Sequence, residues 1–340
     1  MSGRPVLSIL IVTWNVRDMV LACIASIHAD REAPPLEVIV TDNASSDDTV
    51  AAVMRRFPGV RVLANSQNVG FPRANNQALN VARGRYVLYL NPDTEVCAGT
   101  LGTCVRELEA NPDTGMTGCR LEFADGSIQY EGARNAYRFR HLVYELLYLH
   151  MLFPRSRVFG HHRMGDWDHR GTRDVEAVNG AFMMVPRELA LSVGGLPEDV
   201  FMYHEDLSFC LRIRRAGYRI RYLGNVRTIH HCGQSSRRSP ARLGLLEVEC
   251  KQRFIHEADG PAWAGAARVL LGVRALLRLG ICAAGALLPA SWKEPYPRVF
   301  DARLYWLQLR WCIRPQSVST HMPRPPESVM EPLRLGAWPT

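Results

Sequence analysis

Acidic side chains follow two short apolar runs near the start of the chain, where a β-strand would end. Asp42 follows the run EVIVT, and Asp93 follows YVLYL after the turn-forming pair Asn91-Pro92. A carboxylate in such a place can accept hydrogen bonds from a base or ribose, or coordinate a hard cation such as Mg²⁺ or Mn²⁺. Taken singly, each is also explained as a turn residue beside a helix cap. Their recurrence after the second and fourth apolar runs of the chain favours a shared ligand site.

An acidic pair, Glu205 and Asp206, begins a predicted helix in the second half of the chain. Adjacent residues at a helix start point in different directions, so one can face a cleft while the other caps the helix or pairs with Arg212. A hydroxyl that attacks as a nucleophile must lose its proton, and a carboxylate within hydrogen-bond reach is a suitable general base. The helix dipole also favours acidic residues here without any catalytic role. Asp206 is our candidate for the base.

Two histidines, His230 and His231, follow a predicted strand in the motif RTIHHCGQSS. Imidazole is a common ligand for Mn²⁺ and Zn²⁺, although single histidines are also common as structural residues. Cys232 comes next, but the sequence offers no C-x-x-C or H-x-x-x-H partner that would complete a zinc site.

The elements that would position these residues alternate between β-branched runs and helical patterns, which predicts βαβ units on a mostly parallel sheet. The predicted strands are 6–13, 36–41, 60–64 and 86–90, and the predicted helices are 17–29, 47–57 and 72–82. Ser45-Ser46 is expected to cap the second helix. Because ligands of such sheets bind beyond the carboxyl ends of the strands, the polar residues of interest fall in the right place.

The second half is less regular. Residues from about 120 to 173 are rich in Arg, His, Tyr and Trp and lack clear periodicity, which indicates a long insertion or a mobile region. Order returns with an apolar segment at 175–185, a helix that ends at Arg215, and two strands at 218–223 and 226–229.

The net charge of +8 and the pI of about 9.2 favour an anionic partner, such as nucleic acid, a phospholipid surface or a phosphorylated substrate. We expect that the partner is not a nucleic acid, because the basic residues are not interleaved with aromatic residues on a recognisable nucleic-acid-binding module. The nine cysteines form no C-x-x-C pair, which indicates a reducing compartment. The N-terminal apolar run has only about seven residues, so we expect a first strand rather than a signal peptide.

The last hundred residues are basic and helical in pattern. Cationic residues near an anionic leaflet contribute about 1 kcal/mol each, and five follow the last motif: Arg237, Arg238, Arg242, Lys251 and Arg253. The uncharged stretch between Arg278 and Lys293 has 14 residues, short of the roughly 20 that cross a bilayer. An interfacial amphipathic helix and a pair of core-packing helices both fit this pattern.

In order and spacing, six motifs together resemble glycosyltransferase family 2, and within it the bacterial rhamnosyltransferase-like members. The motifs are IVTWN, VIVTDNASSDDT, NVGFPRANN, LYLNPDTEV, VNGAFMMVPRELALSVGGLPEDVFMYHEDLSFCLRIRRAGYRI and IHHCGQSS. They span roughly 6–236, about two thirds of the chain. The resemblance implies an α/β fold of the GT-A kind, a nucleotide-binding mixed sheet flanked by helices. It also implies a nucleotide-sugar donor, inversion at the anomeric carbon, and Mg²⁺ or Mn²⁺ on the diphosphate.

The resemblance also assigns roles to residues. Asp206 and Glu205 form the catalytic pair, with Asp206 as the base. Asp93 is the last carboxylate of the D-x-D metal motif, whose first position is Asn91 here; this departure leaves one carboxylate and predicts modest metal affinity. The expected donor contacts are Thr13, Asn15, Asp42, Asn43, Asn68, Gly70, Arg73, Asn76 and Asn91.

His230 matches a histidine that touches metal or diphosphate in relatives, through the H-x-x-G-x-S spacing to Gly233 and Ser235. It is our second metal candidate, ahead of His231. The stretch from Gly194 through Glu198 stands where relatives have G-G-F-D-E and is expected to form part of the acceptor-side wall.

The resemblance implies transfer of a sugar to a lipid-linked or polysaccharide acceptor in cell-surface glycan synthesis. The favoured sugar is rhamnose, with dTDP-rhamnose as its donor. A lipid-linked acceptor favours a cytoplasmic protein that is peripheral on the inner face of the cytoplasmic membrane. The expected organisation is a GT-A domain at 1–236 with a donor half to about 118, a basic amphipathic helical extension at 237–320 and a loosely ordered Pro-rich tail at 321–340.

Other classes fit less well. A sugar nucleotidyltransferase would need a Gly-rich basic loop after the first strand, where this chain has TWNVRDM. No G-x-G-x-x-G follows a strand, which excludes a dinucleotide oxidoreductase. A membrane-associated protein that binds sugar nucleotides without turnover remains an alternative.

Overall fold

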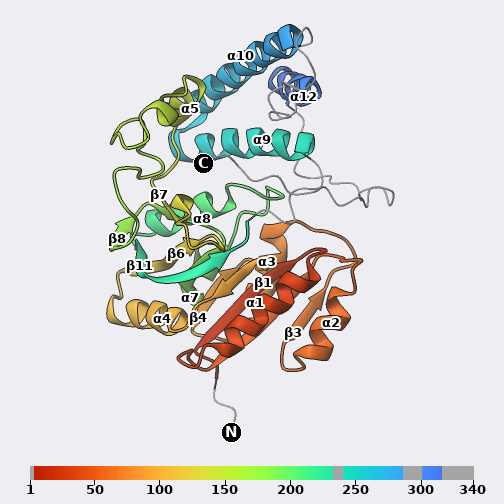
Figure 1. Cartoon of the computed structure of the whole chain (residues 1–340), viewed down its shortest axis with the longest axis vertical. Coiled ribbons are helices and arrows are strands. Elements are labelled where there is room, and N and C mark those ends of the chain that lie inside the picture. Colours follow the sequence, from red (N-terminus) through yellow and green to blue (C-terminus); the bar gives the residue numbers. More distant parts are fainter. Residues whose placement is uncertain (1–3, 233–239, 286–300, 316–340) are drawn as a thin grey trace.

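Nine strands form one mixed sheet in the computed structural model, which describes residues 4–232, 240–285 and 301–315, without the side chains of 240–243. The order is β3 (Arg61–Ala64), β2 (Leu36–Asp42), β1 (Leu7–Thr13), β4 (Tyr86–Leu90), β10 (Phe182–Pro186), β6 (Thr114–Glu122), β11 (Arg219–His230) and β5 (Thr94–Val96), while β8 (Thr172–Val175) pairs with β11. The α/β fold with a mixed sheet and flanking helices is confirmed (Figure 1).

The strands β3, β2, β1 and β4 run parallel, and β10 pairs antiparallel with β4. In this register Thr13 lies opposite Asp42, so both residues stand at the carboxyl edge of the sheet. The fourth strand covers the predicted residues 86–90, and its end carries the turn that leads to Asp93. The predicted convergence of strand-end residues is therefore confirmed.

Helices cover both faces of the sheet because strand residues alternate between the two faces. On one face, Ile9 and Ile11 pack with α1 (Arg17–Ala29), α2 (Thr49–Arg56) and α4 (Thr100–Ala110). On the other, Leu10 packs in a core with α3 (Phe71–Val81), α7 (Arg187–Ser192) and α8 (Glu205–Arg215). Among these helices, α1 has the predicted bounds.

The irregular middle stretch contains short elements that the sequence did not predict: the turn η1 (Tyr130–Gly132), β7 (Ala133–Arg134), α5 (Phe139–Leu146) and α6 (Leu149–Leu152). β7 pairs with β9 (Ala177–Val178) in a separate two-stranded sheet. The two strands predicted at 218–223 and 226–229 are one strand, β11. A register irregularity between Leu223 and Arg227 lets this strand continue past the break in its apolar pattern.

In the described part of the chain, three helices follow the sheet: α9 (Pro240–Asp259), α10 (Pro261–Gly285) and α12 (Ala302–Ile313). Figure 1 shows α9 lying over α8, with α10 and α12 beyond it at the end of the molecule away from the N-terminus. Within the described ranges, no helix combines the length and apolarity needed to cross a bilayer. The predicted motif residues Gly233 and Ser235, the basic residues Arg237 and Arg238, and the tail at 321–340 lie outside the described residues.

Candidate active site

Buried polar atoms without a partner mark the carboxyl edge of β1 and β2. The Thr13 hydroxyl and Asp42 Oδ1 are both buried and lack a hydrogen-bond partner in the described chain. Asp42 Oδ2 accepts from Ser45 N–H at 2.9 Å, which fixes the carboxylate and leaves its other oxygen toward the site. Because a buried polar atom without a partner is costly, this edge is built to receive hydrogen-bonding groups from outside the chain.

Asn43 joins this edge to the next loop. Its backbone N–H donates to Thr13 O at 2.9 Å, and its side chain donates to Gly70 O at 3.3 Å and accepts from Asn65. Asn68 Oδ1 in turn accepts from Gly70 N–H at 3.0 Å. The structure thus brings together four of the predicted donor contacts, Thr13, Asp42, Asn43 and Gly70, with Asn68 behind them.

Asn15 has a structural role that the sequence did not predict, and its contact with the donor stays a prediction. Its Oδ1 accepts from the backbone and hydroxyl of Ser46, and its own N–H donates to Ser45 Oγ. These bonds clamp the loop after β1 to the loop after β2. The serines are therefore occupied, the expected Ser45-Ser46 cap is wrong, and α2 begins at Thr49 after Asp48.

Arg73 and Asn76, also predicted donor contacts, face the second half of the chain. Arg73 Nε lies 3.2 Å from Glu198 Oε2, and the Asn76 amide donates to Leu196 O and Glu198 Oε1 while accepting from Leu196 N–H. These bonds use both hydrogens of the Asn76 amide. The two side chains tie α3 to the turn at 194–198, and their contact with the donor stays a prediction.

Asp93 and His230 form the second centre of the site. The Asp93 side chain is 9% exposed, and its Oδ1 lies 3.5 Å from His230 Nε2. The ladder between β5 and β11 positions them, since His230 pairs with Thr94. Asn91 supplies backbone groups to the turn before Asp93: its N–H donates to Ala181 O, and its carbonyl accepts from Thr94 Oγ1.

The orientation of the His230 ring is fixed from behind by Gln129. His230 Nδ1 lies 2.9 Å from Gln129 Oε1, and the Gln129 amide donates to His230 O at 2.6 Å. An outer partner on Nδ1 leaves Nε2 toward Asp93, as in histidines that bind metals. Burial lowers the pKa of His230, but hydrogen bonds with Asp93 and Cys232 outweigh it and raise that pKa to about 9. His231 turns away and pairs with Glu95 at 2.7 Å.

Asp93 and His230 fit a divalent cation only if phosphate groups of a bound substrate and water complete its coordination shell. In the described ranges, no group of three or more His, Cys, Asp or Glu side chains could hold a metal. A cation such as Mg²⁺ typically takes one or two protein ligands and completes its shell with substrate phosphates and water. Asp93 and His230 supply that number of ligands, and a cation bound there would displace the proton that the raised pKa keeps on His230.

Asp206 is held and kept ionised at the start of α8. Its Oδ2 accepts from the Arg134 guanidinium and from Gly180 N–H at 3.1 Å, and its Oδ1 accepts from Leu207 N–H at 2.8 Å. Burial raises the pKa of Asp206, but Arg134, His204 and the Gly180 N–H together outweigh it and hold that pKa below its ordinary value. The predicted pairing of this acidic pair with Arg212 is wrong, since Arg212 lies 3.7 Å from Glu257.

Glu205 is in the opposite electrostatic state. Its Oε2 is buried without a partner among the described residues, and burial together with the Asp206 charge raises the pKa of Glu205 to about 8. The two residues before it, Tyr203 and His204, both have positive φ, at 75° and 62°. Left-handed backbone at non-glycine residues typically persists at functional sites, where surrounding structure enforces it.

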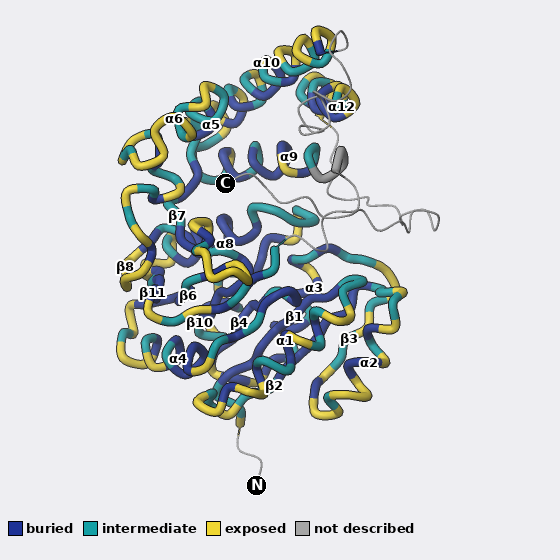
Figure 2. Tube along the Cα trace, viewed as in Figure 1, coloured by how far each residue is buried: buried dark blue, intermediate teal, exposed yellow. Residues whose placement is uncertain are grey.

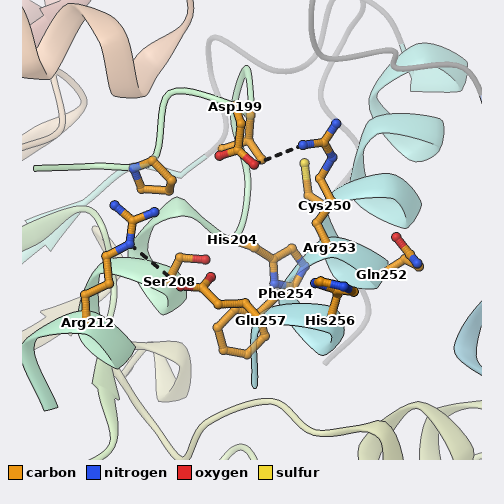
Figure 3. Close-up of a pocket in the computed structure, with 12 residues that line it drawn as sticks. Asp199, His204, Ser208, Arg212, Cys250, Gln252, Arg253, Phe254, His256 and Glu257 are labelled. Carbon is orange, nitrogen blue, oxygen red and sulfur yellow. Dashed lines mark hydrogen bonds and ion pairs between the residues drawn. The ribbon is translucent and has the colours of Figure 1, made fainter. Parts of the chain in front are cut away.

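A cavity of about 390 Å³ lies on the other side of His204, between the loop at 197–204, α8 and α9 (Figure 3). Its charged residues pair with one another: Arg253 with Asp199 at 3.0 Å and Arg212 with Glu257. None of the predicted catalytic, donor or metal residues lines it. The candidate active site is therefore the strand-end edge rather than this cavity.

Two positioning residues, Arg134 and Gln129, were not predicted from the sequence. Both lie in the stretch without periodicity, and only the tertiary fold brings them to Asp206 and His230. Gly180 lies in the motif that begins VNGAFMMVP, but the motif alone does not indicate that its N–H donates to Asp206.

A family model described as "Glycosyl transferase family 2" matches residues 8–166, which include Asp42 and Asp93. The chain belongs to glycosyltransferase family 2. The match ends before Asp206 and His230, so the roles of those two residues rest on the geometry above and on their motifs.

Relatives of this family-2 protein extend the similarity further along the chain. An N-acetylglucosaminyl-diphospho-decaprenol L-rhamnosyltransferase of Mycobacterium tuberculosis is 27% identical over 265 residues, covering 75% of this chain and 84% of the relative. An uncharacterized protein of Sinorhizobium fredii is 28% identical over 272 residues, 76% of this chain but 27% of its own length. The chain thus spans about a quarter of that second relative.

Among solved structures, a mannosyltransferase from Pyrobaculum calidifontis in complex with GDP-Man and Mn²⁺ has a similar fold. The TM-score is 0.53 at 19% identity, covering 93% of this chain and 89% of that one. The family-2 protein therefore has the predicted GT-A fold.

Proposed function

We propose that the chain transfers a sugar from a nucleoside-diphosphate sugar to an acceptor hydroxyl, with inversion at the anomeric carbon. The observation that carries this proposal is the state of Asp206: a buried carboxylate held ionised by Arg134, in a domain whose strand ends present unpartnered hydrogen-bonding groups. An ionised, oriented carboxylate is what a general base for an attacking hydroxyl requires.

In the proposed reaction, the acceptor oxygen attacks the anomeric carbon as the bond from that carbon to the diphosphate oxygen breaks. Asp206 takes the proton of the acceptor hydroxyl, and the nucleoside diphosphate leaves from the opposite face. A single displacement of this kind inverts the anomeric configuration. Asp42 Oδ1 and the Thr13 hydroxyl would bind the nucleoside.

Asp93 and His230 would hold Mg²⁺ or Mn²⁺ against the diphosphate. Such a cation, when bound, stabilises the negative charge that develops on the leaving group. The structurally similar mannosyltransferase is described with Mn²⁺, which supports this part of the proposal.

The name of the mycobacterial relative supports rhamnose as the sugar and a polyprenyl-diphosphate glycan as the acceptor. The favoured donor is dTDP-rhamnose, as the resemblance of the motifs implies. We infer a role in cell-surface glycan synthesis at the cytoplasmic face of the membrane, since such an acceptor is anchored in a bilayer. The chain would work there as a peripheral protein.

The test is release of nucleoside diphosphate by the purified protein from a panel of nucleotide sugars, with Mg²⁺ or Mn²⁺ and a bacterial polyprenol-lipid extract. We expect release from one donor that requires metal and increases with the lipid. Tight binding of a donor without turnover, under every acceptor condition, would instead identify a sugar-nucleotide-binding protein that is inactive.

A further inference from the structure

Exposed large apolar side chains are concentrated at one end of the molecule. Of the eighteen recorded in the described residues, fourteen lie in 147–158, α10 and α12. Met151, Leu152 and Val269 are each about two thirds exposed, at 65%, 67% and 68%. Figure 2 shows these exposed positions around α6 and along α10, beyond α9 from the sheet. A concentration of exposed apolar side chains of this kind marks a candidate interaction site.

The helix α10 is apolar on two sides. Its inner stripe is buried against the rest of the molecule, through Ala264, Ala267, Leu271 and Ala275. Its outer stripe repeats at helical spacing and is exposed, through Val269, Val273, Leu276, Leu277 and Ile281. A helix that is apolar all round is normally buried on all sides, so the outer stripe of α10 lacks a partner in the described chain.

Arg278 joins the three apolar segments into one surface. Its guanidinium bonds the Tyr148 hydroxyl at the start of α6 and lies over the Tyr148 and Tyr305 rings, at 5.7 and 5.9 Å. Tyr305 belongs to α12, so a residue of α10 contacts both neighbouring segments. We call the exposed apolar residues of 147–158, α10 and α12 the apical surface.

The charge of the apical surface identifies its partner. Residues 147–158, 261–285 and 302–313 contain no Asp or Glu and seven arginines: Arg155, Arg157, Arg268, Arg274, Arg278, Arg303 and Arg310. Arg155, Arg157, Arg303 and Arg310 are exposed. Apolar side chains interspersed with arginine and free of acids complement the interface of an anionic bilayer, in which acyl chains lie beneath phosphate groups.

The basic cluster predicted to face the leaflet does not do so where it is described. Lys251 is buried and pairs with Glu145, and Arg253 pairs with Asp199 and Glu249. On the apical surface, Arg155, Arg303 and Arg310 are exposed cationic groups, and Arg157 is 88% exposed although it lies 3.3 Å from Asp166.

The geometry points to the apical surface as a docking face for an anionic lipid bilayer, lying on the membrane rather than crossing it. This inference rests on the proposed function, since it supplies the place where a lipid-linked acceptor would be met. The stretch 129–162 connects the two, because it carries Gln129 and Arg134 in the site and α6 at the surface.

The experiment is flotation of the full chain with vesicles of phosphatidylcholine and phosphatidylglycerol, compared with phosphatidylcholine alone and performed without donor sugar. The test variant is Leu152→Glu with Leu277→Glu, at exposed positions on two segments of the surface. The control is Met54→Glu, equally apolar and 58% exposed on α2. Circular dichroism melts check that each variant is folded.

We expect the wild type to bind anionic vesicles, with the double variant about tenfold or more weaker because apolar burial is lost and repulsion is added. The control binds like the wild type. Equal binding by the double variant, no binding by folded wild type, or a dimer that the same substitutions dissociate would overturn the inference. Because donor turnover is measured separately with detergent-dispersed acceptor, failure here leaves the proposed reaction untouched, and the reverse also holds.

Discussion

Glu205 and Asp206 are adjacent in the chain but differ in ionisation, and this difference separates their roles. Glu205 has a pKa near 8 because it is buried beside a charge, so it is largely protonated at neutral pH. Glutamine is a close mimic of that protonated form. We expect Glu205→Gln to keep turnover at pH 7 within about tenfold of the wild type, a small loss for a group that transfers no proton.

The same carboxyl predicts a pH-dependent difference in stability. The pKa of Glu205 is 4.5 in the unfolded chain and about 8 in the folded one, so deprotonation destabilises the native state as pH rises between these values. Urea unfolding should therefore show Glu205→Gln gaining stability over the wild type as pH rises, with no gain at about pH 4. A difference that does not vary with pH would contradict the assigned protonation.

Arg134 is a positioning residue that acts through Asp206. Without its guanidinium, only His204 and the Gly180 N–H oppose the effect of burial on Asp206, so the pKa of the base rises. In Arg134→Leu we expect the acidic limb of the kcat/KM profile to move to higher pH by about 1–3 units. Arg138→Leu is the matched control, since Arg138 pairs with Asp259 instead. A lower but unshifted profile would reduce Arg134 to a structural role.

The neighbouring histidines allow a direct comparison at the proposed metal site. His230→Gln removes the nitrogen that faces Asp93, whereas His231→Gln removes one bonded to Glu95. We expect the first to weaken metal-dependent donor binding about tenfold or more, and the second to leave it unchanged. Asp93→Ala should behave like His230→Gln. Calorimetry with and without Mn²⁺ measures donor binding by each variant. Equal affinity of the wild type for the donor in the two conditions would contradict the proposed metal site.

At the scale of elements, the loop before α3 is joined to the segment before α8. Gly70 has φ of +90°, and a Cβ there would lie 2.9 Å from Phe201 O, which accepts the Phe71 N–H. This hydrogen bond and close approach tie the donor loop to the backbone that leads to Glu205. This contact connects two motifs that the sequence shows about 130 residues apart.

Gly70→Ala tests this joint. Strained backbone and the clash should lower the unfolding free energy by about 1–3 kcal/mol and weaken donor binding. Gly59→Ala is the control, because Gly59 has no heavy atom within 4 Å of an added Cβ and lies outside the left-handed region. If both variants bind the donor and unfold like the wild type, the contact between Gly70 and Phe201 contributes neither to stability nor to donor binding.

The elements show how far local patterns predict structure. Strand β4 and helix α1 match their predicted bounds because each has a clear apolar pattern flanked by turn residues. The elements at 130–152 were not predicted, since they are two to eight residues long and are stabilised by tertiary contacts such as Arg138 with Asp259. The site followed the same division: Asp42, Asp93 and Asp206 stand at predictable element ends, whereas Arg134 and Gln129 do not.

At the scale of the whole molecule, the proposed reaction site combines three parts. The parallel strands provide the donor edge, β5 and β11 hold Asp93 and His230, and the start of α8 holds Asp206. The apical surface lies at the far end, beyond α9 (Figure 1). This arrangement lets a chain docked on a bilayer keep its donor edge in water.

The most direct test of the central claim compares the wild type with Asp206→Asn for donor binding and for acceptor-dependent release of nucleoside diphosphate. Asparagine preserves the shape of the side chain but cannot accept the acceptor proton. We predict that the variant binds the donor within about threefold of the wild type and loses at least about 100-fold in turnover, the lower end of general-base contributions. Turnover equal to the wild type in a folded Asp206→Asn variant would contradict the assignment of the base, and with it the proposed mechanism.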